Sequence, residues 1–283
     1  MDPATLRERA RIVAAIRRFF DGEGFVEVET PVRIAAPAPE EHIDCPPVAT
    51  GGYLRASPEL QMKKLLAAGM ERIYQIGPCF REGERGSRHN PEFTMIEWYR
   101  RGADYRAIMD DTERLFAELA RLTGFAGVGH PARLLVRDAY RRFAGWDPWT
   151  AWDQDRFDFD MATKIEPAIK AMGGGVFLTD YPAQAASLAR LRGGVAERWE
   201  FYWDGMELAN CFTELCDERE QRARFAKAKA ARQTLGESDY PIDEEFLSCL
   251  PGIGSAAGVA LGVDRLVMVL TGARDISAVR AGE

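Results

Sequence analysis

The sequence predicts an α+β fold in which an antiparallel sheet is flanked by helices. Two observations support this class. The β-rich segments follow one another through hairpins or long helical excursions, and no regular strand–helix–strand alternation occurs. No segment repeats at a fixed period. Hydrophobic residues make up 46% of the 283 residues, which is enough apolar material for a packed core.

The elements of this fold can be assigned in order along the chain. Apolar residues at helical spacing predict an amphipathic helix over 4–20, and alternation predicts a strand over 25–30 that runs into Pro31. The later predicted elements are a helix at 59–68, a hairpin at 73–101, a helix at 104–122, strands at 176–178, 198–203 and 207–212, a charged helix at 217–234 and a strand–helix unit at 258–270. Residues 32–52 are rich in Pro and Gly and predict irregular structure, whereas 123–175 give no clear pattern.

The acidic balance of the chain bears on its partners. Its formal net charge is −7, whereas a protein that mainly binds nucleic acid is usually basic, because such binding neutralises phosphates. This counts against tRNA or DNA as the principal partner. The five cysteines include no CxxC pair, so neither a disulfide framework nor a zinc site is indicated. A charged, helical N-terminus and the lack of a membrane-length apolar run predict a cytoplasmic protein.

The most informative stretch is FREGERGSRHNPEFTMIEWYRR at 80–101, which predicts a strand, a polar loop and a return strand. The loop carries cations such as Arg88 and His89. Glu97 and Tyr99 lie two residues apart and therefore on one face of the return strand. Such a hairpin can hold a polyanion at its tip and an ammonium group at its floor, which suggests ATP and an amino acid.

Three separated segments share the order of a known catalytic core. The segments are GFVEVETP at 24–31, the hairpin at 80–101 and GVDRL at 262–266. In this order they resemble motifs 1, 2 and 3 of the class II aminoacyl-tRNA synthetases. Three pieces between them resemble the lysyl-tRNA synthetase branch: SPE at 57–59, HNPEFT at 89–94 and ELAN at 207–210. Any one motif is weak, whereas the ordered set, which spans about residues 5–272, is specific.

The resemblance also narrows the acceptor of the amino acid. A lysyl-tRNA synthetase carries an N-terminal OB-fold that reads the anticodon, and the short stretch before Phe25 has no room for one. A stand-alone core of this kind is similar to the elongation factor P–lysine ligases, which attach lysine or β-lysine to elongation factor P. We therefore expect residues 1–283 to form a single class II synthetase-like catalytic domain without an anticodon-binding domain.

The resemblance implies an ATP site built around two catalytic arginines. Arg81 and Arg265 would clamp the nucleotide phosphates, because a planar guanidinium makes bidentate, charge-assisted bonds to phosphate oxygens. Phe93 would stack on the adenine. The remaining implied ATP-binding residues are Glu82, Gly83, Glu84, Arg88, His89, Asn90, Glu207, Leu208 and Gly262.

The resemblance further implies a Mg²⁺ site and a lysine pocket. Glu200 and Glu207 would hold Mg²⁺ on the phosphates, since hard oxygen ligands suit this ion. A lysine or β-lysine brings two ammonium groups, so several partly buried acidic groups are needed to replace the water that these cations lose. The implied pocket residues are Ser57, Pro58, Glu59, Glu97, Tyr99, Asn210, Glu214 and Ala260.

The sequence departs from the family pattern at three positions. Gly83 stands where the second motif usually has a glutamate, so either Glu82 or Glu84 would replace that carboxylate. Cys211 stands where lysyl-tRNA synthetases tend to have glycine. Ala260 also stands at a glycine position, and there it resembles the elongation factor P ligases. A methyl group at a pocket wall can exclude one lysine isomer, which hints at a non-standard lysine.

The leading hypothesis is the ATP-dependent activation of lysine or β-lysine as an adenylate and its transfer to a lysine side chain of elongation factor P. The alternatives are a minimal lysyl-tRNA synthetase-like enzyme that charges tRNA, a small-molecule amide synthetase and a catalytically silent regulatory paralogue. The charged helix at 217–234 is either solvated or a docking face for an acidic partner. Since the segment around Pro31 builds the dimer interface in the synthetases, a homodimer is expected.

Overall fold

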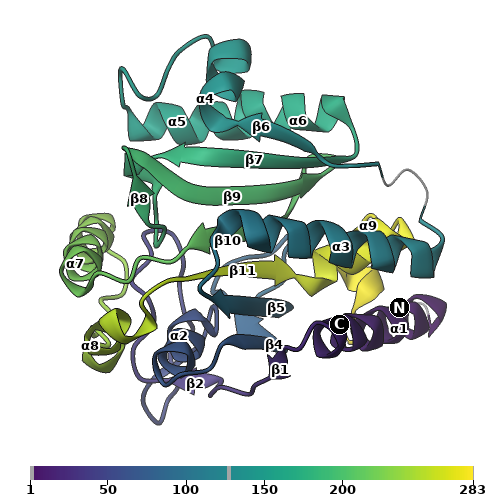
Figure 1. Cartoon of the computed structure of the whole chain (residues 1–283), viewed down its shortest axis with the longest axis horizontal. Coiled ribbons are helices and arrows are strands. Elements are labelled where there is room, and N and C mark those ends of the chain that lie inside the picture. Colours follow the sequence, from purple (N-terminus) through teal and green to yellow (C-terminus); the bar gives the residue numbers. More distant parts are fainter. Residues whose placement is uncertain (1–2, 126–128, 283) are drawn as a thin grey trace.

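A nine-stranded sheet forms the centre of the fold, and Figure 1 shows its strands stacked through the height of the molecule. This computed structural model describes residues 3–125 and 129–282, so residues 1–2, 126–128 and 283 of the predicted 1–283 domain lie outside the described residues. The strands of the sheet are β1 (Val26–Glu27), β4 (Arg72–Phe80), β5 (Glu92–Arg101), β6 (Ala132–Leu135), β7 (Gly175–Pro182), β8 (Leu191–Arg192), β9 (Val195–Trp203), β10 (Met206–Thr213) and β11 (Ala256–Gly262). A second, two-stranded sheet joins β2 (Arg33–Ile34) to β3 (Tyr53–Leu54).

Antiparallel pairing dominates the large sheet. The strand order is β1-β4-β5-β11-β10-β9-β7-β6, with β8 paired to β9. Among the described strands, parallel pairing is confined to β1 with β4 and β6 with β7, at the two ends of this order. The predicted α+β class, with an antiparallel sheet and flanking helices, is therefore confirmed.

The strand predicted over 25–30 is mostly wrong, because β1 covers only two of these residues. The Val28 N–H still donates to the Tyr74 carbonyl at 2.8 Å. The Thr30 N–H, however, donates to the side-chain oxygen of Gln75 at 3.1 Å. A side-chain acceptor takes the place of the next backbone carbonyl, so the ladder of backbone bonds ends before Pro31.

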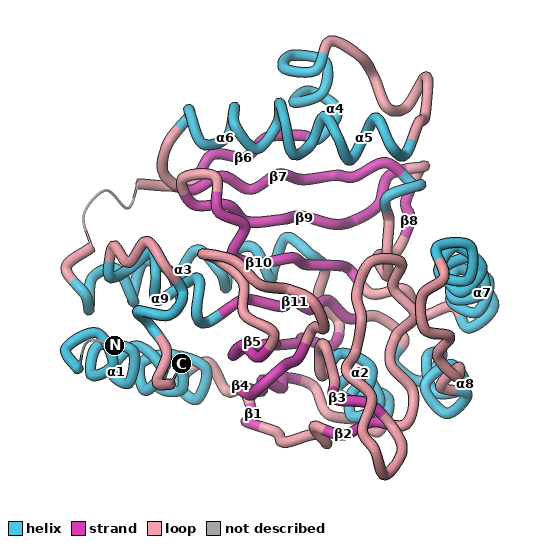
Figure 2. Tube along the Cα trace, turned by 180° about the vertical axis from the view of Figure 1, so that it is seen from behind, coloured by secondary structure: helices cyan, strands magenta, loops and turns pink. Residues whose placement is uncertain are grey.

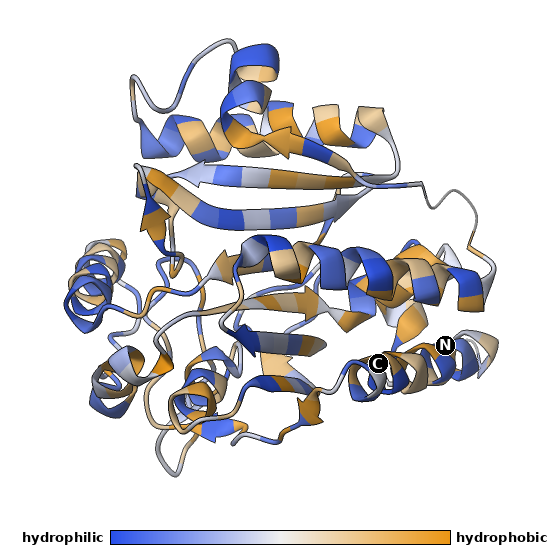
Figure 3. Cartoon of the chain, viewed as in Figure 1, coloured by the Kyte–Doolittle hydropathy of each residue, from blue (hydrophilic) through white to orange (hydrophobic). Residues whose placement is uncertain are grey.

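Three helices cover one face of the sheet. They are α1 (Pro3–Gly22), α3 (Tyr105–Thr123) and α9 (Val263–Thr271), followed by the short 3-10 helix η4 (Ile276–Val279). Their apolar sides form one buried cluster with Trp98, Trp199 and Phe201 of the sheet. Figure 3 shows hydrophobic and hydrophilic patches alternating along α3, as expected for a helix with one buried side. The predicted helices at 4–20 and 104–122 and the predicted strand–helix unit at 258–270 are confirmed.

The opposite face carries long loops, which Figure 2 shows in front of β5, β10 and β11. Beside these loops lie α2 (Glu59–Ala67), α7 (Glu218–Leu235) and α8 (Glu244–Ile253), so the helices predicted at 59–68 and 217–234 are confirmed. Alternation along β5 sorts its side chains between the two faces: Trp98 belongs to the first buried cluster and Tyr99 to the second. The face with the loops is therefore the one that receives Tyr99.

The charge of α7 is largely used within the chain. Arg222 pairs with Glu244 at 2.8 Å, and Lys229 pairs with Asp239 at 2.9 Å. Arg232 is 1% exposed and is bonded to the loop that precedes β3. These internal bonds weaken the hypothesis that this helix is a docking face for an acidic partner.

The stretch without a clear sequence pattern forms a layer of short helices beside β6 and β7, at the top of Figure 1. These helices are α4 (Val136–Ala139), the π-helix η1 (Tyr140–Ala144), α5 (Gln154–Asp160), the π-helix η2 (Met161–Ile165) and α6 (Glu166–Met172); the 3-10 helix η3 (Ala183–Ala185) follows β7. None of the helices in the described part of the chain combines the length and the apolarity that a bilayer span requires.

Candidate active site

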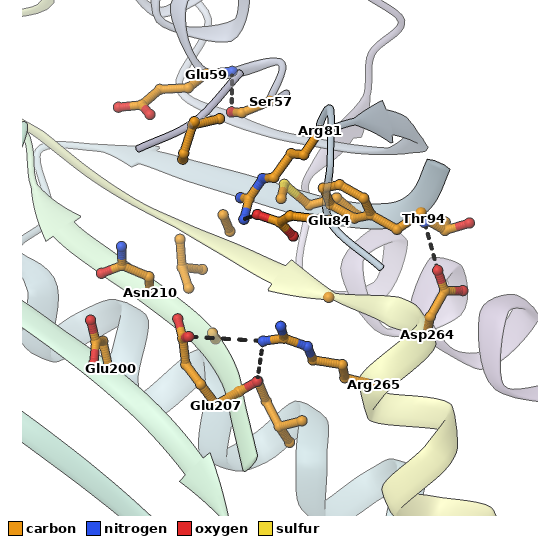
Figure 4. Close-up of a pocket in the computed structure, with 18 of the residues that line it drawn as sticks. Ser57, Glu59, Arg81, Glu84, Thr94, Glu200, Glu207, Asn210, Asp264 and Arg265 are labelled. Atoms are coloured by element: carbon orange, nitrogen blue, oxygen red, sulfur yellow. Dashed lines mark hydrogen bonds and ion pairs between the residues drawn. The ribbon is translucent and has the colours of Figure 1, made fainter. Parts of the chain in front are cut away.

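A cavity of about 580 Å³ opens on the face of the sheet that carries the long loops. Its walls come from β5, β10 and β11, from the loop between β4 and β5, and from the starts of α2 and α9. Figure 4 shows how the side chains of these elements gather: Arg81 and Arg265 approach from two sides, with Glu84 and Glu207 beside them, and Glu59 and Glu200 lie farther along the same cavity. Segments far apart in the sequence thus share one site.

Strand register brings distant residues of the site into one row. Glu97 on β5 pairs with Ala260 on β11. Ala260 pairs in turn with Asn210 on β10, which pairs with Glu200 on β9. Directly paired residues of neighbouring strands lie on the same side of a sheet, with Cβ atoms about 5 Å apart. The row therefore brings two carboxylates and an amide to the cavity side of the sheet.

Glu97 lies beneath the floor of the cavity and is 1% exposed. The Ser57 hydroxyl donates to its Oε1 at 2.5 Å, and the Tyr99 hydroxyl donates to its Oε2 at 2.8 Å. Burial raises the pKa of Glu97 to about 7, and the charge of Glu59 adds to this rise. The Tyr99 ring is seated against Gly258, where an added Cβ would overlap it. A buried carboxylate that is held in this way suits a cationic ligand.

A buried lysine that the sequence interpretation missed joins two of the implied pocket carboxylates. Lys63 Nζ lies 2.5 Å from Glu59 Oε1 and 2.5 Å from Glu214 Oε2. Burial acts to lower the pKa of Lys63, but the charges of these two carboxylates outweigh burial and raise it. With Glu97 close by, three carboxylates share one ammonium, so the floor can accept further positive charge. The i,i+4 spacing of Lys63 from Glu59 was a signal that could have found it.

Arg81 stands at the opposite end of the cavity, where the loop between β4 and β5 begins. Its Nη1 lies 3.5 Å from Glu84 Oε1, and its guanidinium carbon lies 5.1 Å from the centre of the Phe93 ring. Its Nε is buried and has no hydrogen-bond partner among the described residues. Because an unpaired buried donor is costly, this end of the cavity suits an anionic ligand.

The turn after Arg81 explains the glycine at position 83. Gly83 has a φ of 76°, in the left-handed region that favours glycine. The Glu82 N–H donates to the Asp44 carbonyl at 2.8 Å, and the Glu82 side chain does not line the cavity. Glu84 does line it. Of the two candidates for the missing second-motif glutamate, Glu84 is therefore the one placed at the site.

Arg265 reaches into the cavity from the start of α9. Its Nη1 donates to the Glu207 carbonyl at 3.0 Å and its Nε to the Arg88 carbonyl at 3.3 Å. Its Nη2 lies 2.5 Å from Nε2 of His89. Burial, and then the charge of Arg265, lower the pKa of His89, so a neutral imidazole accepts this bond. The adjacent Asp264 accepts a backbone N–H of β5 at 2.8 Å and ties the start of α9 to the sheet.

The two carboxylates implied as Mg²⁺ ligands line the same cavity. Glu200 is engaged by Arg198 Nη2 at 2.5 Å and by the Tyr202 hydroxyl at 2.6 Å, whereas Glu207 Oε2 lies 3.8 Å from Arg265 Nη1. Burial raises the pKa of Glu207 to about 7, and the charge of Glu200 adds to the rise. A divalent cation would relieve this repulsion, so the donors fit Mg²⁺. Among the described residues, no group of three or more His, Cys, Asp or Glu forms a metal site.

Not every residue implied by the sequence belongs to the cavity wall. Pro58, Glu82, Gly83 and Glu97 lie outside the wall, and of these Glu97 lies beneath the floor, bonded to Ser57 and Tyr99, which line it. The implied residues in the wall are Ser57, Glu59, Arg81, Glu84, Arg88, His89, Asn90, Phe93, Tyr99, Glu200, Glu207, Leu208, Asn210, Glu214, Ala260, Gly262 and Arg265. The wall also contains Glu40 and Arg198, which the sequence interpretation did not single out. Arg198 shares a strand face with Glu200, but no sequence signal pointed to Glu40.

The two ends of this cavity have opposite chemistry. Arg81 and Arg265 lie at the loop end, beside Glu84 and Glu207, where they can bind phosphate oxygens. The carboxylates of Glu59 and Glu214 lie at the floor, where they can bind ammonium groups. A polyphosphate and an amino acid with a cationic side chain can therefore lie side by side. Their reacting groups, a phosphorus atom and a carboxylate, would meet between the two ends.

Comparison with known proteins adds an independent finding. The family described as tRNA synthetases class II (D, K and N) matches residues 3–281. The chain is 38% identical to the elongation factor P–(R)-β-lysine ligase of Proteus mirabilis, over 98% of this chain and 94% of that protein. The protein of the same name from Histophilus somni is 38% identical, over 97% of this chain and 93% of that protein. The one from Vibrio cholerae is 36% identical, over 98% of this chain and 94% of that protein.

Proposed function

We propose, from the premise that this chain belongs to the class II tRNA synthetase family (D, K and N), that it is an ATP-dependent ligase that attaches (R)-β-lysine to elongation factor P. Its similarity to ligases of that name, over nearly the whole chain, supports the substrate and the acceptor. The structural observation that carries the proposal is the lining of one cavity, which brings Arg81 and Arg265 together with the carboxylates of Glu59 and Glu214. This arrangement serves the two substrates of an adenylate-forming step.

In the first step the carboxylate of (R)-β-lysine attacks the α-phosphorus of ATP. A bond forms between them, and the bond to the β-phosphate breaks and releases pyrophosphate. Arg81 and Arg265 bind the phosphate oxygens and stabilise the charge that develops on them. No protein side chain has to form a covalent bond, so the protein contributes by positioning the two substrates.

In the second step an amine of a lysine side chain on elongation factor P attacks the acyl carbon of the adenylate. An amide bond forms, the bond from the acyl carbon to the phosphate oxygen breaks, and AMP leaves. The acceptor attacks as the neutral amine, so its ammonium form releases one proton to solvent before the attack and the nitrogen releases a second proton as the amide forms. The ammonium groups of the bound amino acid take no part in this step. They can therefore stay bound to the acidic floor while the acyl group is transferred.

Magnesium would be held by Glu207 and Glu200 together with phosphate oxygens of the nucleotide. The raised pKa of Glu207, caused first by burial and then by the charge of Glu200, supports this assignment, because a cation would stabilise both ionised carboxylates. When bound, Mg²⁺ neutralises charge on the phosphates. The protein's own contribution is to hold two carboxylates on neighbouring strands, β9 and β10, beside Arg265.

The pocket for the amino acid would be formed by the floor of the cavity. Glu97, Tyr99 and Glu214 would receive one ammonium group, and Asn210 would lie beside the chain of the substrate. The Ala260 methyl group would narrow the wall between Glu97 and Asn210. Shape discrimination of this kind contributes about 1–3 kcal/mol between lysine isomers.

The wider assignments rest on the same proposal. The chain would act in the cytoplasm, with residues 1–283 as one catalytic domain, and would form a homodimer. In support of a dimer, β1 lies at one end of the sheet and Val26 on it is 53% exposed. An edge strand with an exposed apolar side chain favours contact with another chain. Light scattering after size exclusion would give twice the chain mass for a dimer, and the mass of one chain would contradict it.

The function is tested by incubating the protein with ATP, Mg²⁺ and either (R)-β-lysine or lysine, together with elongation factor P or bulk tRNA. Intact-mass analysis of the factor should show the addition of one lysyl mass with (R)-β-lysine. Acid-precipitable label on the tRNA should stay at background. Charging of tRNA without modification of the factor would favour the minimal synthetase, and the absence of both products would favour a silent paralogue.

A further inference from the structure

Glu40 belongs to the wall of the cavity, although it comes from the loop between β2 and β3 and not from a motif. Arg232 of α7 holds this loop: its Nη1 donates to the Glu40 carbonyl at 2.8 Å and to the Ile43 carbonyl at 3.1 Å. Its Nη2 lies 2.5 Å from the Asp44 carboxylate. Because Arg232 is 1% exposed, the loop is fixed to the body of the protein. The Glu40 side chain is thus presented to the cavity by a firmly held backbone.

The position of Glu40 within the cavity follows from the charges that act on it. Burial is the largest cause of its raised pKa, followed by the charge of Glu59, while Arg81 and Arg198 oppose the rise. No arginine is among the largest influences on Glu97 or Glu214. The loop of Glu40 is also bonded beside Arg81, because the Glu82 N–H donates to the Asp44 carbonyl at 2.8 Å. Glu40 therefore lies nearer than those two floor carboxylates to the arginine end of the cavity.

The Glu40 carboxylate also has unused bonding capacity. Among the described residues, no side-chain hydrogen bond is one of the main causes of the pKa shift of Glu40. Glu97 differs, because the Ser57 and Tyr99 hydroxyls donate to it and act on its pKa. Glu40 shares the cavity wall with another carboxylate, Glu59, whose charge is the largest electrostatic cause of the raised pKa of Glu40. A cation placed between these two carboxylates would remove their repulsion and give each of them a charge-assisted hydrogen bond.

We propose that Glu40, together with Glu59, binds the inner amino group of the diamino acid, the one that stands closer to its carboxyl group. This inference rests on the proposed function and deepens it by naming a specificity-determining residue. The reacting carboxyl group must lie at the arginine end, beside the α-phosphate. The distal ammonium group then lies over Glu97 and Glu214, and the inner ammonium group falls between these two points, within reach of Glu40.

The test combines one change in the protein with one change in the ligand. The ligands are the sulfamoyl-adenosine conjugates of (R)-β-lysine and of 6-aminohexanoic acid, which has the same chain and the same distal amine but lacks the inner amine. Calorimetry gives the Kd of each conjugate for the wild type and for Glu40→Gln. Loss of a hydrogen bond to a charged group should weaken the β-lysyl conjugate by about 10- to 100-fold. The deamino conjugate should change by about twofold or less.

Glu41→Gln is the matched control, because Glu41 is the next residue of the same loop, is exposed and does not line the cavity. It should leave both Kd values unchanged. Equal weakening of both conjugates by Glu40→Gln, or no weakening of either, would overturn the inference. If Glu40→Gln fails to fold, Glu40→Asp is measured by the same criterion of selective loss.

The assay also separates this inference from the proposed function. Lysine without its inner amine is again 6-aminohexanoic acid, so the same comparison applies to whichever lysine isomer the wild type activates. Wild-type protein that leaves elongation factor P unmodified contradicts the proposed function. Wild-type protein that modifies the factor, combined with an unselective Glu40→Gln variant, contradicts only the role of Glu40.

Discussion

At the floor of the cavity the side chains of Lys63 and Glu214 are each 1% exposed, whereas at the arginine end those of Arg265 and Arg81 are 22% and 27% exposed. The floor is built from a helix and from strand centres, and its charges bond to one another. The arginine end is built from a loop and a helix start, and Arg265 bonds mainly to backbone carbonyls and to His89. The two ends of one site are therefore held to different degrees.

This difference teaches how the site divides its work. A buried floor fixes the shape and charge of the amino acid pocket before the ligand binds. Because its charged groups pair with one another, removing one of them destabilises the fold. The arginine end can lose a side chain without loss of the fold, because its groups remain partly solvated. Substitutions at the floor should therefore act on stability, and substitutions at the arginine end should act on the rate.

The largest expected effect is that of Lys63→Met on stability. Removing the Lys63 ammonium, which bridges Glu59 and Glu214, leaves two buried carboxylates without this partner, which should lower the free energy of unfolding by about 3–5 kcal/mol. Urea unfolding measures the change. The neighbouring Lys64 pairs with Asp243 at 2.9 Å and is more exposed, so Lys64→Met should cost at most about 1 kcal/mol. Equal losses of unfolding free energy in both variants would contradict the special role of the buried Lys63 ammonium in the floor.

The next effect is that of Arg265→Ala on the rate. Losing one preorganised charge should lower the rate of adenylate formation by about 10²–10³-fold, with little change in stability. ATP–pyrophosphate exchange measures the rate, and urea unfolding measures the stability. Arg274→Ala is the control, because Arg274 is exposed and lies outside the cavity wall. Near-normal exchange in Arg265→Ala would contradict the role of this arginine.

A smaller effect is expected from Gly258→Ala on the floor. The added methyl group would overlap the Tyr99 ring and force it away from Glu97, so overpacking should cost about 1–3 kcal/mol of stability. The Kd of (R)-β-lysine should rise as well, which calorimetry measures. In Gly252→Ala the new methyl group meets only ordinary contacts, the nearest at 3.6 Å from the Ala67 carbonyl, so this control should be neutral or slightly stabilising. Unchanged affinity in Gly258→Ala would show that the floor tolerates movement of Tyr99.

The smallest expected effect is a pH dependence of amino acid binding. The substrate ammonium needs ionised Glu97, whose pKa is raised to about 7 by burial and by the charge of Glu59. Affinity for (R)-β-lysine should therefore rise with pH up to about 7 and fall by roughly tenfold per pH unit below it. Calorimetry over this range gives the Kd at each pH. A Kd that stays flat below pH 7 would contradict the protonated state of Glu97.

The same group has a defined effect on stability, and its sign opposes that of the binding effect. The folded pKa of Glu97 lies above its ordinary value of 4.5, so its contribution to stability is fully present below 4.5 and is lost as the pH rises through about 7. Urea unfolding as a function of pH tests this sign. A free energy of unfolding that increases as the pH rises from 4.5 to about 7 would contradict the raised pKa of Glu97.

Local pattern was sufficient for much of the fold. Helical spacing predicted α1, α2, α3 and α7, and the alternation of β5 placed Glu97 and Tyr99 on one face, where the Tyr99 hydroxyl bonds to Glu97 at 2.8 Å. These features depend on residues a few positions apart. The strand at 25–30 failed because the side chain of Gln75, far along the chain, replaces a backbone acceptor.

The sequence by itself determined the class of fold, the order of its main elements and the residue types that gather at the site, because motif order and periodicity are properties of the chain alone. Only the tertiary structure decided that Glu84 and not Glu82 lines the cavity, that Ala260 lies between Glu97 and Asn210, and that Lys63 closes the floor. Strand register and loop anchoring follow from contacts between segments far apart in the chain. A local pattern does not encode such contacts, so these details of the site emerged only with the fold.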